Sequence, residues 1–354
     1  MKYIFLFISL TVLFYSCETD FETNAEWEDI TVVYGLLDQR DSVQYIKINK
    51  AFLGDGDALM FAKIPDSINY DSLIVRIEEW NENGNFVQSI LFNKTEFDKP
   101  NDPNAIFDTT SQIIYKGVIP QYYEIRTIVV GNQITYDTLW LNDKSTYKLF
   151  VQIPDGSKLI TAETYLVQSF EITKPFPGST SIKFEPNPVN TTLFSWDKAD
   201  NDNENNFRYE LQVLFNYKEL TLSGDTLYKY LTLASGVVYP QGGSDELVYY
   251  YKDNNFFISC TNNVPYDDPS TEGNILERYT GKIEIKVTSA ATELNLFMQV
   301  YEPSTSIVQE KPPYTNIENG IGIFSARYYV QQDKKLHDET IADLKEIYYL
   351  KFVR

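Results

Sequence analysis

Four acidic side chains in one polar stretch are of a type that could hold a divalent cation: Asp197, Asp200, Asp202 and Glu204. Calcium prefers such oxygen ligands, and their D-x-D-x-E spacing matches the start of an EF-hand loop. The sixth position of that loop is Asn205 instead of Gly, however, and the twelfth is Leu211 instead of Glu. The spacing therefore excludes an EF-hand and leaves two interpretations, a looser calcium site or a solvated acidic loop.

The composition gives little indication of catalysis or of nucleic-acid binding. His337 is the only histidine, so a Ser-His-Asp triad would require it, yet it lies in a polar stretch typical of the start of a surface helix. One histidine also excludes a multi-histidine metal site. The 50 acidic residues make carboxylate pairs inevitable, so acids alone do not indicate a hydrolase. The formal net charge of −20 argues against nucleic acid, whose phosphates the chain would repel.

Aromatic residues are the better indication of function, because they make up 15% of the chain. Neighbouring tyrosines occur at Tyr122-Tyr123, Tyr249-Tyr250-Tyr251, Tyr328-Tyr329 and Tyr348-Tyr349. Adjacent residues of a strand point to opposite faces, so at least one ring of each group must leave the nearest core. Exposed tyrosines are favoured at binding surfaces, although rings that only shield an outer sheet face would give the same pattern.

Cys17 carries the strongest signal for a covalent modification. Lys2 precedes an apolar run from Tyr3 to Tyr15, and the small residue Ser16 follows, which is the order of a secretory signal peptide. The position of Cys17 resembles the lipobox of bacterial lipoproteins, in its looser Bacteroidota form because Phe14 and Tyr15 are not small. The resemblance implies a signal peptide over residues 1–16, cleavage before Cys17 and acylation of its thiol, enough for stable membrane anchoring.

Residues 17–25 then form a lipidated tether. Glu18, Asp20 and Glu22 follow the anchor directly and either resemble a surface-export tag or only keep the body away from the lipid. Acylation of Cys17 leaves Cys260 without a disulfide partner. Cys260 lies in the apolar, strand-like run FFISC, which predicts a buried and inert thiol.

Strand patterns dominate the mature chain and predict an all-β fold. Apolar and polar residues alternate in Tyr45–Ile48 and in Ile283–Val287, which is typical of half-buried antiparallel strands. Asn83-Gly84 and Asp155-Gly156 are two-residue hairpin signals. The expected strands are Ile30–Leu37, Val43–Phe52, Leu73–Trp80, Tyr147–Ile153, Tyr209–Phe215, Lys282–Val287 and Leu294–Val300. Helix is expected at Asp338–Glu346, with a short turn at Ala58–Lys63.

Length and proline content predict two immunoglobulin- or fibronectin III-like antiparallel β-sandwich domains. The proline-rich stretch 174–188 is the expected linker between an N-terminal sandwich at 26–173 and a C-terminal one at 189–354. In the second half, a strand that ends in Trp196 is followed by a polar loop and an alternating strand from Tyr209. This resembles the B–C strand pair of fibronectin III-like sandwiches, with Ser223–Gly281 containing an insertion.

Two segments, Ile30–Leu59 and Tyr314–Arg327, together with the lipobox, resemble an uncharacterised family of Bacteroidota lipoproteins that often neighbour TonB-dependent outer-membrane receptors. In the second segment, Gly320 and Gly322 flank Ile321, where glycine permits positive φ or close backbone approach. No catalytic residues are established for that family, so the resemblance implies only a role at the cell envelope.

We therefore expect an outer-membrane-anchored lipoprotein that acts as a non-catalytic binding or accessory protein, without a cofactor other than possible calcium. The resemblance implies a TonB-dependent transporter as partner, and the orientation, cell surface or periplasm, stays open. A structural or adhesive surface protein and a carboxylate-based hydrolase are the alternatives. A flat apolar patch would favour a protein partner, whereas a buried carboxylate pair in a cleft would favour an enzyme.

Overall fold

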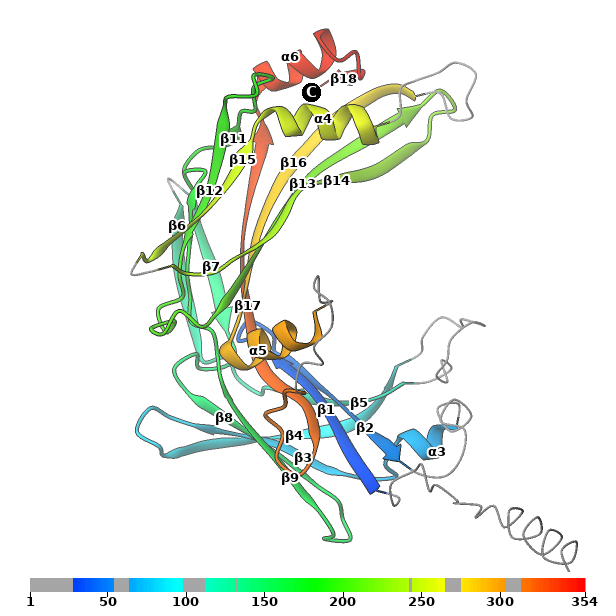
Figure 1. Cartoon of the computed structure of the whole chain (residues 1–354), viewed down its shortest axis with the longest axis vertical. Coiled ribbons are helices and arrows are strands. Elements are labelled where there is room, and N and C mark those ends of the chain that lie inside the picture. The colour runs from blue at the N-terminus through cyan, green and yellow to red at the C-terminus, as the bar shows by residue number, and fades with distance from the viewer. Residues whose placement is uncertain are drawn as a thin grey trace, which may run out of the picture.

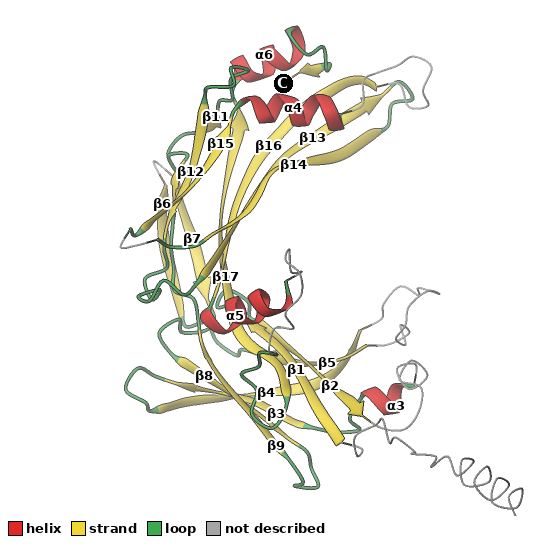
Figure 2. Cartoon of the chain, viewed as in Figure 1, coloured by secondary structure: helices red, strands yellow, loops and turns green. Residues whose placement is uncertain are grey.

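The computed structural model describes residues 28–53, 64–97, 112–130, 133–241, 244–264, 275–302 and 313–353. Strands account for most of them, as Figure 2 shows, so the predicted all-β class is confirmed. The predicted signal peptide, tether and Ala58–Lys63 turn lie outside the described residues.

The lower body in Figure 1 is one curved sheet that closes on itself. Its order is β1 (Glu28–Leu37), β2 (Val43–Leu53), β5 (Gln112–Val118), β4 (Phe86–Phe97), β3 (Ile74–Trp80), β8 (Thr146–Gln152) and β9 (Leu159–Tyr165). The first half of β17 (Ile321–Leu336) pairs in parallel with β1, from Val32 opposite Ile321 onward. An antiparallel bridge between Thr161 and Glu318 then joins β9 to the segment that precedes β17.

Strand alternation explains why this sheet closes. Val33, Ile46, Ile48, Leu149 and Val151 are all at most 1% exposed, and each is flanked by less buried neighbours. A period of two places such residues on one face, and closing the sheet removes that face from water.

The upper body is a sandwich of two antiparallel sheets. One has the order β14 (Thr226–Val238), β13 (Arg208–Thr221), β16 (Ile275–Ala290) and the second half of β17, and the other has the order β10 (Ile172–Lys174), β12 (Thr191–Asp197) and β15 (Glu246–Lys252). Trp196 is fully buried, as predicted. The helices α4 (Asn254–Asn263) and α6 (Asp338–Glu346) lie at the upper end of the molecule (Figure 1). The short strands β11 (Ser181–Ile182) and β18 (Phe352–Val353) pair with β17 and β16.

β17 is shared by the two bodies, because its first half pairs with β1 and its second half pairs with β16. One continuous sheet therefore runs through both predicted domains. The predicted linker 174–188 packs on the upper body, since Ile182 and Phe184 are buried and Lys334 donates hydrogen bonds to three of its carbonyls. The boundaries of the two domains, and their immunoglobulin or fibronectin III identity, stay predictions.

Two predicted strand assignments are wrong. The run Leu294–Val300 lies in the helix α5 (Thr292–Tyr301), because Glu, Leu, Met and Gln are strong helix formers and the local L-N-L alternation is too short to outweigh them. FFISC lies in α4, where Phe256, Phe257 and Cys260 form the buried side of a helix. The helix predicted at Asp338–Glu346 is confirmed.

The remaining elements are the short helix α3 (Pro65–Ile68) and the hairpin of β6 (Glu124–Val130) and β7 (Gln133–Leu139). Hairpin turns lie at both predicted places, but neither is the predicted two-residue turn, because Asn83 and Asp155 lack the positive φ that such a turn requires. The Gly84 N–H donates to Asn81 O at 2.8 Å and the Gly156 N–H donates to Ile153 O at 3.0 Å, so each glycine, with φ of +73° and +75°, is the last residue of a four-residue turn in a longer loop.

Candidate functional site

The outer side of the lower body carries the candidate site, which we call the aromatic face. Residues opposite each other in a sheet point to the same side, so the register identifies its members. Tyr34 lies opposite both Ile323 and Lys47, while Tyr45 lies opposite Lys116. The outward positions of β17, β1, β2, β5 and β4 therefore form one surface. Its exposed apolar residues are Tyr34, Tyr45, Leu91, Phe97, Val118 and Ile321.

The charge of the aromatic face differs from that of the whole chain. At the outward positions of the part of β17 that pairs with β1, of β1 from Ile30 onward, and of β2, β5 and β4, the charged residues are Lys47 and Lys116. Acidic residues occur at its margin, where Glu28 begins β1 at an outward position and Glu293 lies in the adjoining helix α5. The chain as a whole has 50 acidic residues and a formal net charge of −20. Exposed apolar residues with few carboxylates among them are typical of the centre of a protein interface, where charged groups are depleted and aromatic rings enriched.

Helix α5 extends the aromatic face at the junction of the two bodies (Figure 1). It packs on β17, where the Leu294 backbone N–H donates to Ser325 Oγ at 3.2 Å, and Asn295 is its only buried residue. The ring of Phe297 packs edge-on against the ring of Tyr34, with 6.3 Å between the ring centroids, and its centroid lies 4.5 Å from that of the Tyr301 ring. Leu296 and Tyr301 are 40% and 56% exposed, so part of the apolar surface of this helix is open to water beside the sheet.

A second aromatic contact lies further along the same face, where the rings of Tyr45 and Phe97 meet edge-on at 6.1 Å. Rings that support each other lose little side-chain entropy when a partner covers them. The face can thus bind apolar surface, while Lys47 and Lys116 can pair with acceptors of the partner.

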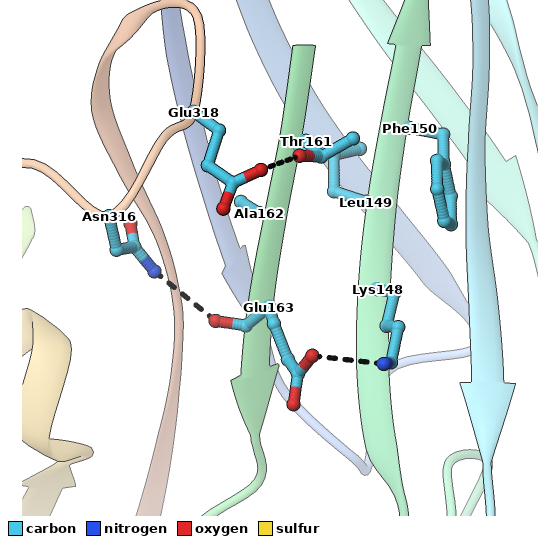
Figure 3. A pocket seen from close by; sticks show the side chains of 8 residues that line it. All are labelled: Lys148, Leu149, Phe150, Thr161, Ala162, Glu163, Asn316 and Glu318. Atoms are coloured by element: carbon cyan, nitrogen blue, oxygen red, sulfur yellow. Dashed lines mark hydrogen bonds and ion pairs between the residues drawn. The ribbon is translucent and has the colours of Figure 1, made fainter. Parts of the chain in front are cut away.

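A shallow hollow of about 370 Å³ lies between β8, β9 and the segment before β17 (Figure 3). Its charged groups are already paired, since Lys148 Nζ lies 3.1 Å from Glu163 and Thr161 Oγ1 donates to Glu318 at 2.7 Å. The Asn316 side-chain amide donates hydrogen bonds to Phe324 O and Glu163 O, and its oxygen accepts one from the Phe324 backbone N–H. These contacts fasten the edge of the sheet, and they leave the hollow without a free nucleophile or acid–base pair.

The four predicted calcium ligands do not converge in the structure. Asp202 is 1% exposed and accepts hydrogen bonds from the Asn206 and Phe207 backbone and from Tyr209 Oη. It therefore organises the loop between β12 and β13, and Glu204 accepts from the Asn206 side chain. In the part of the chain that the structure describes, no group of three or more His, Cys, Asp or Glu could hold a metal ion. The calcium hypothesis stays a prediction.

Asp197 has a different neighbour, because it lies directly opposite Glu246 on β15. Burial and the carboxylates of Glu171 and Glu246 raise the pKa of Asp197, whereas hydrogen bonds from Ser195 and Thr173 lower the pKa of Glu246. A pair with opposite shifts is what acid–base hydrolysis needs. Both side chains are exposed on an open strand surface, however, so nothing excludes water from them.

The remaining predicted site residues have structural roles or fall outside the described chain. His337 precedes α6 and accepts the Glu339 backbone N–H at Nδ1, which confirms it as a helix start. Cys260 is fully buried, as predicted, and burial raises the pKa of its thiol to about 12, which disfavours the reactive thiolate. Cys17 lies outside the described residues.

No protein-family model matches this chain, and no curated protein matches it either. The described helices include none that is long and apolar enough to cross a membrane. The family resemblance and the membrane location therefore stay predictions.

Sequence reasoning identified β1 and β2, the central strands of the aromatic face, but it did not identify β5 or the face itself. The adjacent tyrosine groups drew attention to Tyr250 and Tyr349, which are indeed exposed at 71% and 69%. Tyr34 and Tyr45 are single tyrosines in alternating strands, and only the pairing of β1, β2 and β5 shows that they share a side. The alternation of Tyr45 and Lys47 with buried isoleucines was the available signal.

Proposed function

We propose that this protein is a non-catalytic accessory protein of the cell envelope, tethered to the outer membrane through Cys17, that binds an integral outer-membrane protein through the aromatic face. The family resemblance suggests a TonB-dependent transporter as that partner. The observation that carries the proposal is an exposed aromatic surface with acidic residues only at its margin, on a chain of net charge −20.

The length of the tether supports a partner within the membrane. Ten residues lie between Cys17 and Glu28, where β1 begins, which makes eleven Cα–Cα steps. A fully extended chain of that length spans at most about 40 Å. Acylation of Cys17 would thus keep the start of β1, and the lower body with it, close to the bilayer surface.

The charge pattern supports a protein partner over bare lipid. A surface that bound anionic lipid through charge would need a cluster of basic residues, roughly 1 kcal/mol each. The described outward strand positions of the aromatic face contain two basic residues, Lys47 and Lys116, among many apolar and amide side chains. This proportion is closer to that of protein interfaces than to that of lipid-binding patches.

Purification of the full-length protein from detergent-solubilised outer membranes tests the proposal. We expect a stoichiometric integral membrane protein to remain bound, and we expect the double variant Tyr34→Ser/Tyr45→Ser to release it. Tyr250→Ser is the matched control, because Tyr250 is an exposed tyrosine on β15 of the upper body.

The outcomes separate the alternatives. Release by the double variant with a retained complex in the control supports the aromatic face. A wild-type chain that carries no membrane protein would refute the accessory role and favour a structural or adhesive protein. A chain that remains bound to outer-membrane lipid vesicles through the aromatic face alone would identify lipid as the occupant.

A further inference from the structure

The two edge strands of the long sheet, β9 and β14, differ in whether other described residues form hydrogen bonds with their outer backbone groups. At the β9 end, the outward backbone groups have partners: Asn319 Nδ2 donates to Leu159 O at 2.9 Å, and Asn316 Nδ2 donates to Glu163 O at 3.3 Å. Between them, Thr161 and Glu318 exchange backbone hydrogen bonds of 3.3 and 2.8 Å. Residues 316–319 therefore cap this edge.

The opposite end of the sheet is β14, which pairs with β13 on one side only. Among the described residues, none forms a backbone bridge to its other side. The first five residues, Thr226–Tyr230, are all exposed, which means that neither face of the strand is covered there. Tyr228 and Tyr230 are 84% and 66% exposed and point to the same side.

Proteins usually protect such an edge with prolines, several charges, bulges or very short strands. β14 is 13 residues long and contains no proline, and Lys229 is its only charged residue. Its register shift lies opposite Val213 and Leu214, beyond the exposed residues. The bare stretch is therefore open to pairing with another strand.

We propose that the Thr226–Tyr230 edge of β14 binds an extended segment of another polypeptide by strand addition. The backbone N–H and C=O groups of the edge would supply the hydrogen bonds, and Tyr228 and Tyr230 would pack on apolar side chains of the segment. Lys229, on the other side of the strand, already forms an ion pair of 3.4 Å with Glu219 on β13, so the edge favours a segment that is neutral opposite Lys229 and apolar opposite the two tyrosines.

A second copy of this chain is the less favoured occupant. Two molecules of net charge −20 repel each other, and the five bare residues offer less surface than a stable dimer buries. This surface lies on the upper body, away from the aromatic face, so the inference does not depend on the proposed function (Figure 1).

Amide hydrogen exchange tests the proposal on the full-length protein, in isolated outer membranes and after purification in detergent. We expect amides of residues 226–232 to exchange about tenfold more slowly in membranes than in the purified chain. The variants Tyr228→Lys and Tyr230→Lys, which place charges on a bare edge, should abolish that difference without changing the melting temperature. Tyr250→Lys on β15 is the control and should retain it.

Each result decides the matter. Equal exchange in membranes and in the purified protein would overturn the proposal, and so would a difference that survives both lysine variants. Protection that appears in the purified protein and grows with its concentration would identify a second copy and overturn the proposed occupant.

Discussion

Gly322 offers the sharpest test of how the lower body closes. Its φ is +115°, and a Cβ built there would lie 2.0 Å from Val33 O and 2.9 Å from Val33 C on β1. Gly322→Ala therefore adds two separate costs. The backbone strain of positive φ costs about 1–2 kcal/mol. The contact with β1 forces the parallel β1–β17 pairing apart, and relieving such an overlap costs a further ~1–3 kcal/mol.

Gly84 is the matched control, because it has φ +73° but nothing within 4 Å of a built Cβ. Gly84→Ala should cost only the strain, about 1–2 kcal/mol. Urea unfolding of the full-length protein would measure both variants from their midpoints and slopes. We expect Gly322→Ala to lose at least about 1 kcal/mol more than Gly84→Ala. Equal losses would show that close approach to β1 is not what requires glycine at position 322.

Three further predictions concern buried polar groups. Burial raises the pKa of Glu293, so the charged carboxylate disfavours the folded state at pH values above the ordinary carboxyl pKa. Glu293→Gln should therefore raise the free energy of unfolding at neutral pH and leave it nearly unchanged in acid, which denaturation at both pH values would measure. Arg278 donates to Glu219 at 2.9 Å with both groups almost fully buried, so Arg278→Met should cost about 3–5 kcal/mol, and Glu219→Leu added to it should restore part of that loss in a double-mutant cycle. Lys334 donates to three carbonyls of residues 176–179, so Lys334→Met should cost roughly 2–4 kcal/mol and speed amide exchange there; unchanged exchange would contradict the role of this amine.

Local patterns were sufficient to predict many of the strands, because a strand with one buried face shows directly as alternating apolar and polar residues. Ile283, Ile285 and Val287 are fully buried, while Glu284 and Lys286 between them are not, as their alternation predicts. The same rule failed for Leu294–Val300 and for FFISC. Both runs are too short to distinguish a strand from a buried helix, and their tertiary contacts decided the outcome.

The candidate site could be foreseen only in its parts. An acidic loop looked like a metal site because carboxylates are dense there, but Asp202 turns inward to Tyr209 and to the loop backbone. That inward turn depends on the packing of β12 and β13, which residue spacing does not contain. Gly320 and Gly322 were predicted to permit close approach or positive φ, and both are confirmed by what a Cβ would meet.

The sequence by itself determined the all-β class, the places of the two hairpin turns and the buried Trp196, because these follow from local alternation, turn residues and hydrophobicity. Only the tertiary structure decided that β17 joins two bodies, that residues 316–319 cap one edge while β14 stays bare, and that Tyr34, Tyr45 and Lys116 share one face. These features depend on contacts between residues far apart in the sequence, from 71 residues for Tyr45 and Lys116 to 289 for Val32 and Ile321, and pairing over such separations is selected by the whole core, not by neighbouring residues.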